Sequence, residues 1–406
     1  MSEEMVLHIL SRLPSKSLMR FKCVRKSWYT VINNPMFVES HLSNSMHNKF
    51  STCILFKRFV QSDTNTGEKE LGFSFLYLCN DYNDNEHNVN SVVEDIKFTL
   101  STGQYIGLEV IESLSIIAHC HGIVCLCDGS DNIVLCNPAI KELKLLPQSC
   151  LPQLIQCGVG FGYDPKSKDY KVHRISCDGE EIYGDRLVFF PPRVEIYTLN
   201  TDSWRQIKNN YLETEDTFFW PDYFQMYWKG ICYWVGYEQP KEFESYFDRL
   251  EDEQKKTMIF LFDTGDEVFR NILLPDSLYE PPEYRYVMRI LVWNESVALF
   301  GLDSFGTFDE RYGLWVLDDF DGAKSSWTRN LTFDPMAGIK SILEFWKSDE
   351  IVMVTRNGDI VSYNPGTNKL KNLPMHFENP SLVETIVFVD TLVPVMGGNK
   401  LVDVDK

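Results

Sequence analysis

The feature that most limits the possible folds of this 406-residue chain is a strand-turn-strand unit that occurs five times. In each unit a short run rich in Ile, Val, Leu, Phe or Tyr ends at an Asn or Asp, and a second short run follows. A unit of the observed length holds about four strands, which is typical of a propeller blade. The residues that head the five turns are Asn137, Asn200, Asp263, Asp318 and Asn364, at spacings of 63, 63, 55 and 46 residues.

The two ends of this β region contain strands that belong to no complete unit. Apolar runs at residues 52–56 and 73–78 precede the first unit, and runs at 384–389 and 391–395 follow the last. Joined to each other, they supply a sixth blade. The sequence therefore predicts an all-β, kelch-like β-propeller with six blades over residues 46–406. A pair of β-sandwiches is the alternative, but sandwiches do not require one unit to recur five times.

Residues 1–45 have a different pattern and are expected to form a small all-α module of three short helices. Apolar residues at helical spacing predict a first helix that Pro14 ends, because proline cannot continue the hydrogen-bond ladder. Ser15 is expected to cap the second helix, and the third runs from about Val24 to the Asn-Asn-Pro sequence at 33–35. So short a module tends to keep an apolar face for a partner. A cap that packs on the β domain is the other interpretation.

The residues of this module resemble the F-box of plant F-box proteins. The motifs that carry the resemblance are Ile9 to Pro14, Lys16 to Leu18, Phe21 to Val24, and Lys26 to Trp28. The resemblance implies a module that docks on a Skp-type adaptor and, through it, on a cullin and a RING protein. The adaptor-binding residues that these motifs imply are Ile9, Leu10, Leu13, Pro14, Leu18, Phe21, Val24, Lys26 and Trp28.

Motifs in the β region extend the resemblance over nearly the whole chain. Phe161 to Pro165, Asp169 to Val172 and His121 to Leu126 resemble the plant F-box-associated domain. More narrowly, Lys22 to Trp28, Arg193 to Tyr197, and Tyr227 to Gly230 are similar to the pollen S-locus F-box proteins of rosaceous plants. This similarity implies an SCF-type ubiquitin ligase subunit that binds pistil ribonucleases (S-RNases) in the pollen tube cytosol during self-incompatibility. Another basic protein of plant signalling or defence is the alternative target.

The distribution of charge agrees with a basic partner. The formal net charge is −19, and because residues 1–42 carry +3, the rest of the chain carries −22. Such a field repels nucleic acid and anionic membranes and attracts basic proteins. A high net charge that serves only solubility is the alternative. No apolar run approaches the ~18 residues of a membrane span, and no signal-peptide pattern begins the chain, so a cytoplasmic protein is expected. The 11 cysteines are then interpreted as free thiols.

An insertion between two blade strands combines acidic with aromatic side chains. Aromatic anchors inside a charged rim are typical of a protein-binding hot spot. The preceding segment is interpreted as a loop that adds Phe218, Phe219 and Trp220 to this surface. The candidate substrate-binding residues are Glu242, Phe243, Glu244, Tyr246, Phe247, Asp248, Glu251 and Asp252.

No motif of a catalytic, cofactor or phosphate-binding site is found. A zinc site built from His119, His121, Cys125 and Cys127 is disfavoured, because His119 and Cys127 would lie about 26 Å apart on one extended strand. A sharp bend at Gly122 is the alternative that would bring these residues together. The chain is therefore expected to be a receptor without metal or cofactor. A propeller enzyme or a sugar-binding module, with the helices as a cap, is the alternative of a different class.

Overall fold

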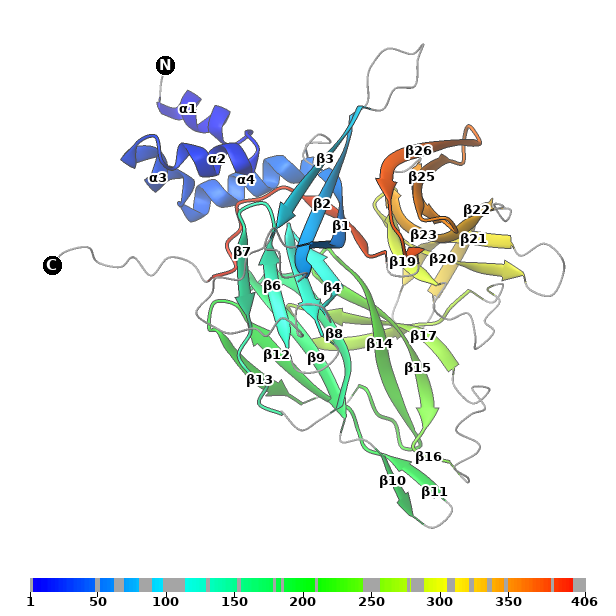
Figure 1. Ribbon diagram of the computed structural model, residues 1–406. Coiled ribbons are helices and arrows are strands. Elements are labelled where there is room, and N and C mark those ends of the chain that lie inside the picture. Colours follow the sequence, from blue (N-terminus) through cyan, green and yellow to red (C-terminus); the bar gives the residue numbers. More distant parts are fainter. Residues whose placement is uncertain are drawn as a thin grey trace. The chain divides into compact units, whose positions relative to one another are not determined.

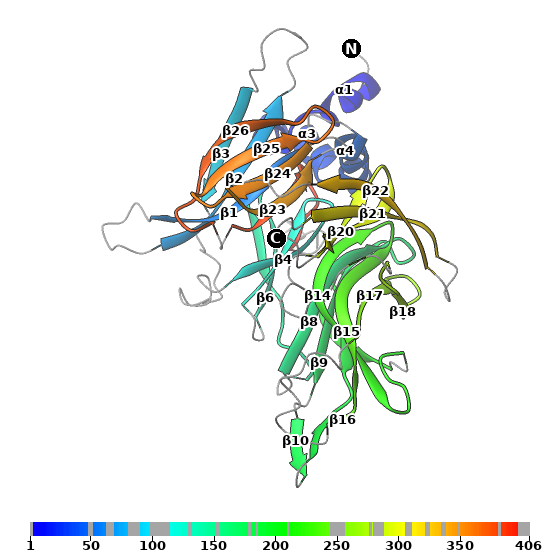
Figure 2. The same ribbon diagram turned by 90° about the vertical axis from the view of Figure 1, so that its right-hand side faces the viewer.

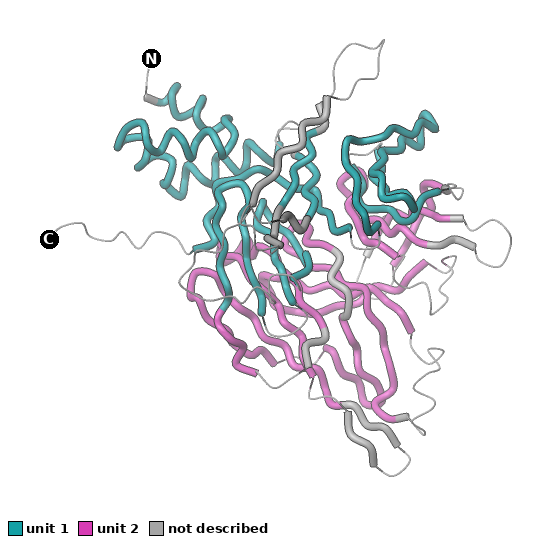
Figure 3. The backbone as a smooth tube through the Cα atoms, in the orientation of Figure 1, with its two compact units in different colours: residues 1–146, 338–406 teal, residues 147–337 magenta. Residues whose placement is uncertain are grey.

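A computed structural model of the chain forms two compact units, residues 1–146 with 338–406 and residues 147–337 (Figures 1 and 3). The residues that the structure describes are 3–47, 52–61, 69–79, 90–97, 114–128, 132–151, 155–177, 180–183, 186–208, 211–243, 256–275, 278, 288–304, 311–320, 325–333, 338–346, 350–380 and 383–396.

The first unit begins with four helices rather than the three that the sequence predicts. They are α1 (Glu3–Leu10), α2 (Ser15–Phe21), α3 (Lys26–Ile32) and α4 (Pro35–His47). The Asn-Pro pair that was expected only to stop α3 also starts α4. The side chain of Asn34 accepts a hydrogen bond from the backbone N–H of Met36 at 2.9 Å, as an N-cap does. Pro35 fits the first helical position because no N–H is required there.

The predicted cap of the second helix is wrong. Pro14 holds the N-cap position of α2 without a side-chain hydrogen bond, and Ser15 lies inside the helix. The carboxylate of Asp390, 375 residues away in sequence, accepts hydrogen bonds from the Ser15 backbone N–H at 2.9 Å and from the Ser15 hydroxyl. A carboxylate at a helix N-terminus satisfies free N–H groups and interacts favourably with the helix dipole.

Three four-stranded antiparallel sheets follow in the first unit. One has the order β27 (Thr385–Val389), β1 (Thr52–Gln61), β2 (Lys69–Cys79) and β3 (Asn90–Lys97), so the last strand of the chain pairs with the first. The register runs from Thr52 opposite Val389 to Phe56 opposite Thr385, which confirms the predicted joining of the two ends. The other two sheets are β4 (Ser115–Cys120), β5 (Ile123–Cys127), β6 (Ile133–Asn137) and β7 (Glu142–Leu145), and β23 (Ile339–Trp346), β24 (Glu350–Thr355), β25 (Asp359–Asn364) and β26 (Lys369–His376).

The second unit also contains three four-stranded antiparallel sheets (Figure 2). Their strands, in sequence order, are β8 (Ile155–Asp164), β9 (Asp169–Cys177), β12 (Arg193–Thr198) and β13 (Ser203–Ile207); β14 (Thr217–Trp228), β15 (Ile231–Pro240), β17 (Lys256–Asp263) and β18 (Val268–Ile272); and β19 (Arg289–Trp293), β20 (Ser296–Ser304), β21 (Arg311–Phe320) and β22 (Ser325–Phe333). A smaller sheet pairs β10 (Glu180–Tyr183), β11 (Arg186–Phe189) and β16 (Glu242–Phe243). The described residues thus form six blade-like sheets, and the predicted six-bladed propeller class is confirmed.

The turn-heading residues explain why the unit recurs. The side chains of Asn137, Asp263 and Asn364 each accept a backbone N–H from two or three residues further on, at 2.9–3.0 Å. This local bond fixes the turn between the third and fourth strands of a blade. Asp318 differs, because β21 continues through it to Phe320.

The predicted single extended strand at residues 119–127, on which a zinc site was disfavoured, is wrong. Residues 119–127 form a hairpin rather than one extended strand, because the chain turns at His121 and Gly122, where φ is +51° and +77°. A side chain at Gly122 would lie 2.4 Å from the carbonyl oxygen of Val389, so only glycine fits. Within the described part of the chain, no group of three or more His, Cys, Asp or Glu residues is arranged to hold a metal ion.

Candidate functional site

The four helices enclose a small apolar core of their own. Leu10, Leu18, Ile32 and Phe37 are buried there, and they pack against Ile140 and Leu392 from the β region of the same unit. Leu10 and Leu18, which were expected to contact an adaptor, are 3% and 0% exposed. Their side chains therefore hold the module together in this structure.

The other predicted adaptor residues are more accessible. Ile9, Pro14, Val24 and Lys26 are exposed. Leu13, Phe21 and Trp28 are partly buried, and the rings of Phe21 and Trp28 lie 5.4 Å apart between α2 and α3.

Other large apolar residues of the helices, which were not predicted to bind the adaptor, are exposed too. Tyr29 in α3 is 57% exposed, close in sequence to the predicted residue Val24, which is 62% exposed between α2 and α3. Met5, Leu7 and Met36 are exposed as well. The exposed basic residues of the same helices are Arg12, Lys16, Arg20, Arg25 and Lys26. Apolar side chains among basic ones are suited to an acidic protein partner with an apolar centre.

Polar contacts hold α4 against the segment between α1 and α2. The Nε2 atom of His41 lies 2.9 Å from the carbonyl oxygen of Leu13, and the Asn44 amide donates to the carbonyl oxygen of Ser11 at 3.2 Å. Burial lowers the pKa of His41, so its ring is neutral at pH 7. The unexpected fourth helix is therefore an integral part of the module.

The candidate substrate residues fall only partly on described positions. Glu242 and Phe243 form β16, opposite Val188 and Leu187 of β11. The six remaining residues lie outside the described residues, namely Glu244, Tyr246, Phe247, Asp248, Glu251 and Asp252.

The expected aromatic loop before this insertion is a strand. Phe218 and Trp220 belong to β14 and are 2% and 5% exposed, packed with Cys177. The interpretation of these rings as surface anchors is therefore wrong. Phe219, the third ring of the predicted surface, is partly buried and packs against the Phe260 ring of β17.

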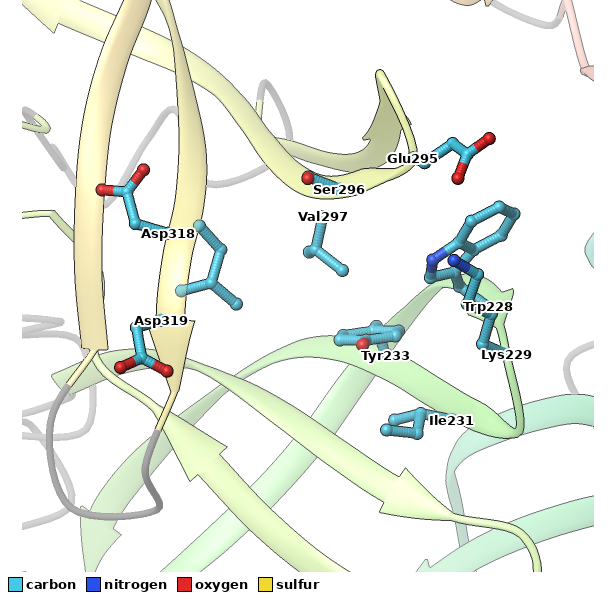
Figure 4. Close-up of a pocket in the computed structure, with 10 residues that line it drawn as sticks. Trp228, Lys229, Ile231, Tyr233, Glu295, Ser296, Val297, Asp318 and Asp319 are labelled. Carbon is cyan, nitrogen blue, oxygen red and sulfur yellow. The ribbon is translucent and has the colours of Figure 1, made fainter.

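A groove that the sequence analysis missed lies between two sheets of the second unit. It has a volume of about 360 Å³, and Figure 4 shows Asp318 and Asp319 on one side, Trp228 and Lys229 on the other, and Tyr233 and Val297 between them. Burial raises the pKa of Tyr233 to about 12, so its phenol is uncharged. The lining residues are Trp228, Lys229, Ile231, Tyr233, Glu295, Ser296, Val297, Leu317, Asp318 and Asp319. They come from three different strand ends, so no single sequence motif could have indicated the groove.

A buried cluster around Glu195 in the second unit holds the fold together through an ion pair and hydrogen bonds. The Glu195 carboxylate lies 3.2 Å from Nη1 of Arg174 and accepts hydrogen bonds from the Ser149 hydroxyl at 2.5 Å and the Cys150 backbone N–H at 3.0 Å. Desolvation and the Glu195 carboxylate raise the pKa of the Cys150 thiol to about 11. Cys150 is therefore a thiol at neutral pH and has no nucleophilic character.

Comparison with known proteins agrees with this architecture. The family model described as F-box domain matches residues 1–40, and the model described as F-box associated beta propeller domain matches residues 29–393. The chain belongs to the F-box proteins with an F-box-associated β-propeller.

Relatives in Arabidopsis thaliana are named as F-box proteins. A putative F-box protein is 24% identical over 78% of this chain and 74% of its own length, and the F-box protein CPR1 is 22% identical over 95% and 88%. An F-box/kelch-repeat protein is 26% identical over 80% of this chain and 72% of its own. The broad family expected from the sequence is confirmed, whereas the narrower S-locus similarity is not among these findings.

An F-box implies binding to a Skp-type adaptor within an SCF complex. No helix within the described ranges combines the length and apolar character that crossing a membrane requires.

Proposed function

We propose that this F-box protein is the substrate-recognition subunit of an SCF-type ubiquitin ligase, in which helices α1–α4 bind the adaptor and the propeller holds the protein to be ubiquitinated. The supporting observation is that Val24 and Tyr29 are more than half exposed and take no part in the core that the helices form with Ile140 and Leu392. Exposed apolar side chains that are not needed for a core are typical of an interface.

Titration of a purified Skp-type adaptor with the full chain tests the adaptor face. Val24→Glu is expected to weaken binding at least tenfold, because it removes an apolar contact and adds a charge that the interface must desolvate. Leu370→Glu is the matched control, since Leu370 is 52% exposed on β26. Wild-type affinity in the folded Val24→Glu variant, or no binding by the wild type, contradicts the proposal.

The propeller is proposed to position the substrate and not to catalyse ubiquitin transfer itself. Holding a substrate lysine near a ubiquitin-charged enzyme raises the effective concentration of that lysine. The chain itself needs no catalytic residue or cofactor for this role.

The proposed cargo is the S-RNase of the pistil, encountered in the pollen tube cytosol. The support is the similarity of residues 22–28, 193–197 and 227–230 to pollen S-locus proteins, together with the charge of −22 on residues 43–406. A binding panel of several purified S-RNases tests this cargo, with a basic ribonuclease from a non-pistil source as control. Equal binding of all basic ribonucleases would favour another basic target and exclude S-RNase specificity.

The acidic segment 242–252 is the contact proposed for this cargo. Exchange of Glu242, Glu244, Asp248, Glu251 and Asp252 for amides is expected to slow association about tenfold at low salt, because long-range attraction acts on the encounter rate. Stopped-flow kinetics at low and physiological salt measure this effect. Unchanged association at low salt would place the binding face elsewhere on the propeller.

A further inference from the structure

The groove of Figure 4 combines an apolar floor with an acidic rim. Tyr233 and Val297 at its floor are buried, whereas Glu295, Asp318 and Asp319 at its rim are exposed. Three carboxylates stand against one ammonium group, that of Lys229, among the lining residues. The volume of about 360 Å³ is in the lower part of the range for ligand sites, which suits a side chain and its neighbours rather than a large cofactor.

The three parts of the groove belong to neighbouring strand ends of one unit. Trp228 and Lys229 lie at the turn from β14 to β15, Glu295 at the turn from β19 to β20, and Asp318 near the end of β21. Beneath them, apolar residues of the two sheets form a shared core that includes Tyr233, with Trp228 packed against it. The groove is therefore anchored on packed β-structure, which favours a preformed site.

The Trp228 ring of the groove already contacts one cation of the chain itself. The Nζ atom of Lys229 lies 4.9 Å from the centroid of the Trp228 ring, a cation–π arrangement. The carboxylate of Asp318 is oriented by a hydrogen bond from the Thr328 hydroxyl at 2.7 Å. An indole face on one side of the groove and an oriented carboxylate on the other match a guanidinium or ammonium group on an aliphatic stem.

We propose that this groove binds an exposed arginine or lysine side chain of the substrate protein. The aliphatic stem packs on Tyr233 and Val297, and the cationic head lies between the Trp228 ring and the carboxylates of Asp318 and Glu295. The proposal rests on the function proposed above, because it assigns a substrate contact to a receptor. It also gives Lys229 a definite role, that of an internal cation that competes with the substrate for Trp228.

Peptide binding to the full chain tests the proposal without an identified substrate. The probes are labelled pentapeptides Gly-Leu-X-Leu-Gly in which X is arginine, lysine, citrulline or acetyl-lysine, measured by fluorescence polarisation. Citrulline and acetyl-lysine keep nearly the size of the parent side chains but lack their charge. The arginine and lysine peptides are expected to bind at least tenfold more tightly than their neutral counterparts, with an affinity that falls as salt rises.

Variants locate the binding in the groove. The triple change Glu295→Gln, Asp318→Asn and Asp319→Asn is expected to weaken arginine-peptide binding about tenfold. Lys229→Ala is expected to strengthen it severalfold, an effect that a merely structural role of Lys229 does not produce. The control triple of exposed acids, Glu39→Gln, Glu215→Gln and Glu378→Gln, changes the net charge equally and is expected to leave affinity within twofold.

Three results overturn the proposal. The first is equal binding of the arginine and citrulline peptides. The second is an equal loss of peptide affinity in the groove triple variant and the control triple variant. The third is tighter binding of a neutral oligosaccharide that competes with the peptide. Adaptor affinity is measured on the same preparations. Loss of peptide binding with intact adaptor binding rejects the groove alone, whereas intact peptide binding without adaptor binding rejects the receptor function.

Discussion

At the scale of single residues, motifs that suggest a family turn out to shape the fold. The Tyr227 hydroxyl donates to the carbonyl oxygen of Tyr163 at 2.8 Å and accepts the Gly230 N–H at 3.0 Å. A side chain at Gly162 would lie 2.4 Å from the Tyr227 ring, so glycine leaves the space that the ring fills. The motifs at 161–165 and 227–230 therefore fasten the β8–β9 hairpin to the β14–β15 hairpin.

A buried histidine gives a prediction at the same scale. His173 is 0% exposed, with the Phe262 ring 4.6 Å away, and burial lowers its pKa to about 3. The unfolded chain binds this proton at the ordinary pKa of 6.5, so the neutral ring stabilises the fold above that pH. Stability is lost as the pH falls from about 6.5 towards 3, by at most about 1.4 kcal/mol for each pH unit.

Urea unfolding between pH 7.5 and 4.5 measures this dependence. His173→Phe is expected to flatten the decline relative to the wild type, whereas His8→Gln, at an exposed position, is expected to leave it unchanged. Parallel curves for the wild type and His173→Phe would contradict the assignment.

At the scale of elements, features held by local contacts could be predicted from the sequence, whereas features held by contacts between distant residues could not. The blade unit was predictable because an Asn or Asp that bonds to a backbone N–H two or three residues ahead is a local signal. The start of α4 was ambiguous because proline both ends one helix and suits the first turn of the next. The cap of α2 and the groove depend on residues far apart in the sequence, so local patterns contain no trace of them.

The long-range cap of α2 gives a prediction for that element. Asp390→Ala is expected to weaken the first turn of α2 by about 1 kcal/mol, the typical value of an N-cap. Hydrogen exchange at the amides of residues 15–18 then becomes about fivefold faster. Glu378→Ala, which removes an exposed carboxylate elsewhere in the same unit, is expected to have no such effect. Unchanged exchange in α2 would show that Asp390 is not its cap.

At the scale of the whole molecule, the chain ends contribute to both modules. Strand β27 pairs with β1, Asp390 caps α2, and Leu392 enters the core of the helices. The C-terminal segment of the first unit thus joins helices α1–α4 to the β region. The helical module, the propeller and the pairing of its two end strands were accessible from sequence, but the contacts of Asp390 and Leu392 with the helices were not.

Deletion of strand β27 tests whether this strand closes the sheet against β1. Deletion of residues 383–406 is expected to cause aggregation, because the edge of β1 from Thr52 to Phe56 loses its partner. Deletion of residues 397–406, which removes no described residue, is the control and is expected to elute and unfold as the full chain does. Size-exclusion chromatography and thermal unfolding distinguish the outcomes. A soluble chain that still unfolds cooperatively after the longer deletion would contradict closure by β27.

The central claim is that one chain binds an adaptor with its helices and a substrate with its propeller. A bridging measurement tests it most directly, in which a Skp-type adaptor is immobilised and retention of an S-RNase is recorded with and without the full chain. The account predicts retention only when the chain is present, loss with Val24→Glu in the helices, and no loss with the Leu370→Glu control. Failure of the wild-type chain to bind the immobilised adaptor would contradict the account, whatever the propeller binds.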